Sequence, residues 1–210
     1  MHLLITSHLS YAATTPCDVL LQVEVAPSAQ QICRSTRLML DPGSRSFAVA
    51  GDDGGSTRRW ISAGAEFQCT YEARVEVIRP AVVMDTLIET PRMDIPAEVI
   101  KYLFPSRYCQ SDLFLDFVAQ QFGGLRGGPL VAALSDWIGR NFTYDNTASN
   151  AGTTATDSFA SQSVVCRDYA HVLIALVRAA GLPARMVSAY APEVVPQDFH
   201  AVVEVYLDGG

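Results

Sequence analysis

Lysine is almost missing from this chain of 210 residues. It occurs once, at Lys101, and arginine supplies the other 14 of the 15 positive charges. Acidic residues number 22, so the formal net charge is −7. A chain with this charge lacks the basic surface that binds phosphate backbones or anionic lipids. We therefore expect no nucleic acid and no membrane among its partners.

Paired cysteines are missing as well. The five cysteines stand at positions 17, 33, 69, 109 and 166, without any Cys-x-x-Cys pair. An odd number at irregular spacing argues against a disulfide framework or a zinc cluster. No calcium loop of the Asp-x-Asp-x-Asp-Gly type occurs either. We expect no metal, no cofactor and a reducing, cytoplasmic setting.

Long apolar runs are absent. No stretch of 18 apolar residues occurs, so no membrane-spanning helix is predicted. The first eight residues contain no Lys or Arg and only a three-residue apolar core, which is unlike a secretory signal. Hydrophobic residues still make up 49% of the chain, enough for a well-buried core in one large domain or two small ones.

Residues 1 to 85 are predicted to form a small antiparallel β-sandwich domain. Short strand-like segments are separated by turn residues at 26–28, 41–43 and 51–55. No catalytic cluster is evident there, and Arg58 and Arg59 are expected to be solvated. The predicted strands are 18–25, 36–40, 46–50 and 68–78.

Residues 86–210 are predicted to form an α+β domain, with helices first and strands last. A proline-punctuated linker spans 80–91, and the polar stretch 144–163 is typical of a surface loop. Apolar positions 166, 169, 170, 173, 176, 177 and 180 predict one buried stripe on the last helix, which Gly181 ends. The predicted helices are 96–104, 113–122, 130–142 and 166–180, and the predicted strands are 184–190 and 199–207.

Cys166 is the first candidate for catalysis. A buried cysteine is commonly an inert core residue, but Cys166 falls in the first turn of a predicted helix. Unpaired N–H groups and the helix dipole favour a thiolate there, and the same N–H groups can bind an oxyanion. Gln162 is a candidate second oxyanion donor, although a solvated loop glutamine is the commoner reading.

His200, at the start of the last strand, is the natural base for this thiol. His171 is five residues after Cys166 on the same helix, so it is rotated about 140° away and lies about 7.5 Å along the axis. It does not easily reach the thiol, and a surface pair with Asp168 is expected instead.

A Cys–His pair usually needs a third group to orient the imidazole. Along one strand, Asp208 lies roughly 26 Å from His200 and Glu204 roughly 13 Å, so both are too far. Asp198, at about 7 Å, is poorly placed. The orienting residue is therefore expected to be missing. Arg185, on the preceding strand, is expected in a structural ion pair.

Three segments together resemble the core of the transglutaminase-like superfamily. They are Cys166-Arg-Asp-Tyr-Ala-His-Val-Leu173, the helix–turn–strand segment 176–190, and His200-Ala-Val-Val-Glu-Val-Tyr-Leu207. Residues 102–112 and the N-terminal β region resemble the bacterial branch, whose members carry a small β domain before the core. Two positions depart from the family pattern: Val164, where glycine is frequent, and Val202, where tryptophan is frequent.

The resemblance implies a papain-like fold with helices packed on an antiparallel sheet, Cys166 as nucleophile and His200 as base. The implied activity is thiol-dependent acyl transfer at amide bonds of a protein or peptide, as in a cysteine protease or amidase. The family's third residue is an Asp past a turn that Asp208-Gly-Gly210 resembles, so we expect a truncated, poorly active core.

Two alternatives stay open: a protein-glutamine transglutaminase, and a non-catalytic interaction module that retains the fold. The substrate and the oligomeric state are not specified by the sequence.

Overall fold

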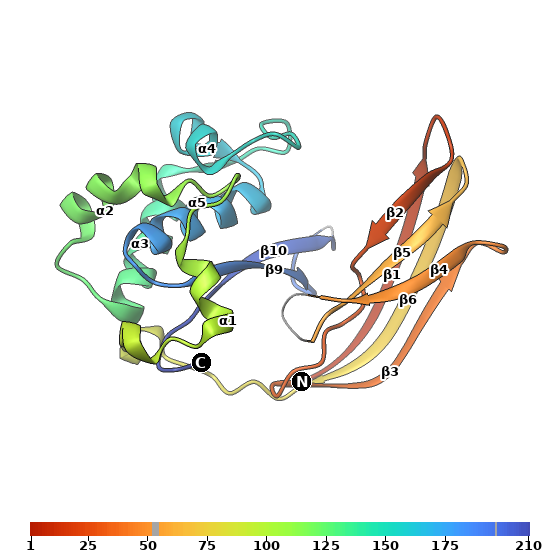
Figure 1. The fold of residues 1–210 in the computed structure, drawn as a ribbon, viewed down its shortest axis with the longest axis horizontal. Coiled ribbons are helices and arrows are strands. Elements are labelled where there is room, and N and C mark those ends of the chain that lie inside the picture. The colour runs from red at the N-terminus through yellow and green to blue at the C-terminus, as the bar shows by residue number, and fades with distance from the viewer. Residues whose placement is uncertain (52–54, 196) are drawn as a thin grey trace. The chain divides into compact units, whose positions relative to one another are not determined.

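The structure is a computed structural model that describes residues 1–51, 55–195 and 197–210. The chain divides into two compact units, Met1–Ala81 and Val82–Gly210 (Figure 1). Of the turn predicted at 51–55, residues 52–54 lie outside the described residues.

Unit 1 consists of two three-stranded antiparallel sheets with the orders β1-β6-β3 and β2-β5-β4. This arrangement confirms the antiparallel β fold expected for the first part of the chain. The strands are β1 (His2–Ala12), β2 (Cys17–Leu21), β3 (Gln31–Leu40), β4 (Arg45–Ala50), β5 (Thr57–Ala63) and β6 (Glu66–Val77).

Strict alternation along β6 builds the core of unit 1. Phe67, Cys69, Tyr71, Ala73 and Val75 are all buried, whereas residues between them are more exposed, as the two-residue period of a strand requires. Burial raises the pKa of the Cys69 thiol, so this cysteine stays neutral and acts as a core residue.

Two features of unit 1 were not predicted. Strands β1 and β5 were not predicted, because Ser7 interrupts the apolar face of β1 and only two residues of β5 are buried. Arg59 is not simply solvated, since its guanidinium lies 2.8 Å from the Glu24 carboxylate. Arg58 donates to the Gln22 side chain at 3.3 Å.

Unit 2 is a mixed α+β unit, as predicted. Its two longer strands, β9 and β10, pair antiparallel with His200 opposite Ala189, and two short strands, β7 and β8, pair in parallel. The elements are η1 (Met84–Thr86), η2 (Arg92–Asp94), α1 (Ala97–Ile100), η3 (Lys101–Leu103), η4 (Ser111–Phe114), α2 (Leu115–Phe122), α3 (Gly127–Asn141), β7 (Thr143–Tyr144), α4 (Ala155–Ser161), β8 (Ser163–Val164), α5 (Cys166–Ala179), β9 (Ala184–Tyr190) and β10 (Phe199–Val205).

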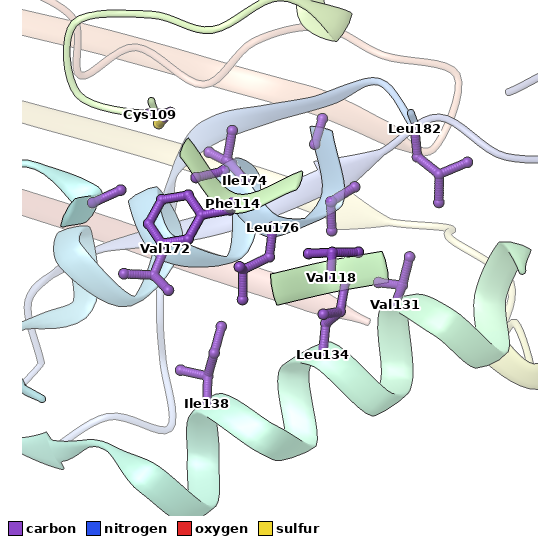
Figure 2. Packing of buried hydrophobic residues seen from close by; sticks show 14 of the residues in the cluster. Cys109, Phe114, Val118, Val131, Leu134, Ile138, Val172, Ile174, Leu176 and Leu182 are labelled. Carbon is purple, nitrogen blue, oxygen red and sulfur yellow. The ribbon is translucent and has the colours of Figure 1, made fainter. Parts of the chain in front are cut away.

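Helix α5 is the centre of unit 2. It contacts α2, α3 and α4 as well as both strands β9 and β10. The single buried stripe predicted for it was wrong, because Val172 and Ala175 are fully buried while Tyr169 and Leu173 are only partly so. A helix enclosed by neighbours buries most of its circumference. Figure 2 shows its residues meeting Val118, Leu134 and Ile138 from the surrounding helices.

The stretch 144–163 is not the continuous loop that was predicted. Its second half forms α4, which begins with a capping box: the Thr154 hydroxyl accepts the Asp157 N–H, and the Asp157 carboxylate accepts the Thr154 N–H. Phe159 then packs within an aromatic cluster, with its ring centroid 5.0 Å from that of Phe117 and 5.4 Å from that of Trp137. One partly buried aromatic ring thus anchors a short helix in a polar sequence.

Hydrogen bonds join residues 88–90, near the start of unit 2, to residues 208–209. The Ile88 N–H donates to the Asp208 carboxylate at 3.2 Å, and the Asp208 N–H donates to the Ile88 carbonyl at 3.1 Å. The Gly209 N–H reaches the Thr90 hydroxyl at 2.9 Å. At the start of α3, a Cβ on Gly128 would lie 1.7 Å from the Met84 carbonyl oxygen, so only glycine allows this close approach.

Candidate active site

Cys166 is the first residue of α5 and is partly exposed. The residue before it, Val165, is extended at φ −106° and ψ 174°, and its carbonyl accepts the Asp168 and Tyr169 N–H groups. The first N–H groups of a helix have no partner within the helix. The thiol therefore stands beside unpaired backbone donors at the positive end of the helix dipole.

Asp168, two residues further on, is fully buried. Its carboxylate accepts the Val165 N–H at 3.2 Å and lies 3.3 Å from the Arg167 guanidinium. Arg167 also donates to the Ser149 hydroxyl at 2.6 Å and to the Asn150 carbonyl at 2.7 Å. The predicted surface position of Asp168 was wrong, because its buried carboxylate turns back to the residue before the helix and pairs with Arg167.

His171 is buried as well, with only 5% of its surface exposed. Its ring stacks on that of Tyr108 at a centroid distance of 5.3 Å, and its Nδ1 has no hydrogen-bond partner. Burial lowers the pKa of His171, and the nearby Arg167 charge adds to this effect. The expected surface pair of His171 with Asp168 was therefore wrong.

His200 is the second residue of β10 and is partly buried. Since α5 packs against β10, the two elements that carry the thiol and the imidazole are in contact. Val203 and Val205 pack on the core, so alternation along the strand places His200 with Val202 and Glu204 on the other face. Among the described residues, no hydrogen bond joins Cys166 to His200.

The three carboxylates weighed as orienting groups all have other partners. Asp198 accepts the Phe199 N–H at 2.7 Å, and Asp208 holds Ile88. Glu204 lies 2.8 Å from the Arg185 guanidinium, which confirms the ion pair expected for Arg185. Within the described ranges, then, none of these three carboxylates hydrogen-bonds the His200 ring.

Gln162 lies between α4 and β8 in the left-handed region, at φ 54°, a conformation uncommon for residues other than glycine. Its N–H donates to the Ser158 carbonyl at 2.9 Å, and its carbonyl accepts the Thr143 N–H at 2.8 Å. The side chain is exposed. The backbone of Gln162 is thus fixed, while its amide group faces solvent four residues before Cys166.

The Arg167–Asp168 pair was not recognised from the sequence. The available signal was an acidic residue at the third position of a helix beginning at Cys166, where a carboxylate can reach back to the residue before the helix. That signal was assigned instead to a surface pair with His171.

A comparison with known families assigns this arrangement. The sequence profile of the transglutaminase-like superfamily matches residues 119–210, a range that contains Cys166, His200 and Gln162. The second unit belongs to the transglutaminase-like superfamily. Its central helix beginning at cysteine, and the antiparallel strands packed against that helix, are the α+β core that the family resemblance implied.

Two solved structures resemble this chain. A protein from Cytophaga hutchinsonii, described as a "putative cysteine protease", is 29% identical with a TM-score of 0.89, over 100% of this chain and 76% of that one. The periplasmic domain of TgpA from Pseudomonas aeruginosa is 24% identical with a TM-score of 0.46, over 95% of this chain and 65% of that one. No curated protein matches.

In the part of the chain that the structure describes, no helix has both the length and the apolar character needed to cross a bilayer. None of the described His, Cys, Asp and Glu side chains gather in groups of three or more that suit a metal ion.

Proposed function

We propose that this protein is a thiol-dependent acyl-transfer enzyme that acts on amide bonds of a protein or peptide, chiefly by hydrolysis. The observation that carries this proposal is a partly exposed cysteine as the first residue of the central helix of a transglutaminase-like core. The description of the Cytophaga hutchinsonii protein as a cysteine protease supports hydrolysis as the leading reaction.

In the proposed reaction, His200 takes the proton of Cys166, and the sulfur attacks the amide carbonyl carbon. The tetrahedral oxyanion is bound by N–H groups at the start of α5, with the Gln162 side chain as the second donor. The C–N bond then breaks, and His200 returns the proton to the leaving amine. Water attacks the resulting thioester, which releases the acid and regenerates the thiol.

This chemistry requires the thiol and the imidazole to come within hydrogen-bond reach. The two groups are not hydrogen-bonded in the free protein, and catalytic hydrogen bonds commonly shorten only when substrate binds. Helix α5 packs on β10, and in this proposal the start of β10 turns the His200 ring toward the thiol when substrate binds. His200 therefore acts as the base in the substrate complex in this proposal.

The test is hydrolysis of a peptide mixture by wild type and variants. We expect Cys166→Ala and His200→Asn each to lower kcat/KM by about 10³-fold or more. Cys17→Ser is the matched control, because Cys17 is an exposed free cysteine in unit 1, and it should hydrolyse like wild type. Equal hydrolysis by wild type and Cys166→Ala would contradict the proposal.

The same assay separates the alternatives. Water and an amine attack the same thioester, so incorporation of a labelled amine into a glutamine-containing peptide identifies a transglutaminase. A Cys166 thiol that iodoacetamide fails to modify at pH 6, together with no hydrolysis, identifies a non-catalytic module.

The cytoplasmic location likewise stays a prediction.

A further inference from the structure

Two charged side chains, Arg167 and Asp168, lie in the first turn of α5 next to the proposed nucleophile. Asp168 is fully buried, although aspartate is rarely buried without a partner. One carboxylate oxygen accepts the Val165 N–H, and the other lies 3.3 Å from Arg167. The hydrogen bond to the Val165 N–H fixes the Val164–Val165 peptide group, one residue before Cys166.

Arg167 connects this carboxylate to a separate segment. Its Nη2 donates to the Ser149 hydroxyl and to the Asn150 carbonyl, at 2.6 and 2.7 Å. Those residues lie in the loop between β7 and α4. The loop, the arginine, the carboxylate and the Val165 peptide thus form one continuous hydrogen-bonded chain that ends beside the thiol.

A carboxylate in this place does not help to ionise the thiol. Its negative charge lies in the same helical turn as Cys166 and disfavours a second anion there. The other titratable groups nearby are Arg167 and His171 on α5, and Asp145, whose carboxylate accepts the Ser163 hydroxyl beside β8. The benefit of Asp168 must therefore lie in geometry, since its charge works against the thiolate.

We propose that Asp168 is a positioning residue for the thiol, anchored to the 149–150 segment through Arg167. Without this anchor the Val164–Val165 peptide at the start of α5 loses its fixed orientation, and the sulfur and the neighbouring oxyanion donors lose alignment with the carbonyl. Small displacements of aligned groups can slow a reaction by about 10²-fold. The inference rests on the proposed function, because it takes Cys166 as the nucleophile.

The test combines two measurements on Asp168→Ala, which removes the acceptor of the Val165 N–H: peptide hydrolysis, and hydrogen exchange of the Val165 amide. We expect kcat to fall about 10- to 100-fold with KM near that of wild type. The Val165 amide should exchange faster, because it has lost its acceptor. Asp136→Asn is the control, since Asp136 forms an exposed pair with Arg140 on α3, and it should change neither measurement.

Three results would overturn the inference: unchanged kcat and exchange, a fall in kcat without faster exchange, or faster exchange without a fall in kcat. The second would mean that Asp168 acts other than through the Val165 N–H. Ser149→Ala serves if Asp168→Ala fails to fold, because it removes only one acceptor of Arg167; we expect kcat to fall about 3- to 10-fold, and unchanged kcat there overturns the inference.

Failure of the proposed function is distinguishable from failure of this inference. If wild type hydrolyses no amide, the inference is judged on hydrogen exchange of the Val165 amide alone. Asp168→Ala should speed that exchange, because the amide loses its acceptor. An unchanged exchange rate would then refute the positioning role of Asp168.

Discussion

Asp168 and His171 lie about one turn apart on α5 and are both shielded from solvent, yet their situations differ. The carboxylate has two partners, whereas the Nδ1 atom of His171 has none and its ring rests on Tyr108. A buried group without a partner is stable only in its uncharged form. The imidazole is therefore neutral in the folded protein.

This neutral state makes the free energy of unfolding depend on pH. Burial holds the pKa of His171 below its ordinary value of 6.5, so the unfolded chain takes up a proton first as the pH falls. The contribution is present above about pH 6.5 and is lost as the pH falls towards the lowered pKa. We expect the urea midpoint of wild type to decrease more between pH 7.5 and 5.5 than that of His171→Phe.

Phenylalanine keeps the stack on Tyr108 and cannot be protonated, which makes it the matched variant. His2→Gln, at an exposed position, should retain the wild-type pH dependence. If His171→Phe loses as much stability on acidification as wild type, another group is responsible.

At the scale of elements, α4 shows how little sequence is needed to hold a short helix. Its seven residues are too few for stability in isolation. The Thr154–Asp157 capping box pairs the orphan N–H groups at its start, and Phe159 anchors it to the aromatic cluster. Each contribution is separable by mutation.

Replacing Thr154 with alanine removes the hydroxyl that accepts the Asp157 N–H. We expect the free energy of unfolding to fall by about 1 kcal/mol, with faster hydrogen exchange at residues 155–161. Urea titration and exchange mass spectrometry measure the two effects. Thr14→Ala, in an exposed turn of unit 1, should change neither, and an unaltered α4 in Thr154→Ala would show that Phe159 suffices.

The elements of this chain were predictable where periodicity and end signals agree. The predictions for β6, β9 and α5 hold because each rests on a local signal. The signals are alternation along the strands, Cys166 at the start of α5, and Gly181 after its end. Strand β1 and helix α4 were not predicted, because Ser7 interrupts the apolar alternation of β1 and residues 155–161 are mostly polar. The contacts that stabilise these two elements are supplied only by the folded unit. The candidate site follows the same division: Cys166 and His200 are readable locally, whereas the burial of Asp168 depends on the distant 149–150 segment.

At the scale of the molecule, each unit has its own core. Ile61 and Tyr71 are fully buried in unit 1, and Leu134 and Leu176 are fully buried in unit 2. Their neighbours come from the same unit. Damage to one core should therefore be confined to the unit that contains it.

We expect Ile61→Ala and Leu134→Ala each to cost about 2–5 kcal/mol of unfolding free energy, but in different units. Hydrogen exchange should accelerate in β5 and β6 for the first variant and in α3 and α5 for the second. Leu125→Ala, at a position 38% exposed, should leave both units unchanged. Acceleration throughout the chain in either core variant would show that the units unfold together.

The hydrogen bonds that join residues 88–90 to residues 208–209 have a mechanical consequence. The segment through which the chain enters unit 2 is bonded directly to residues 208 and 209. We expect tension applied between residues 88–90 and 208–209 to load these few hydrogen bonds before it reaches the helices around α5.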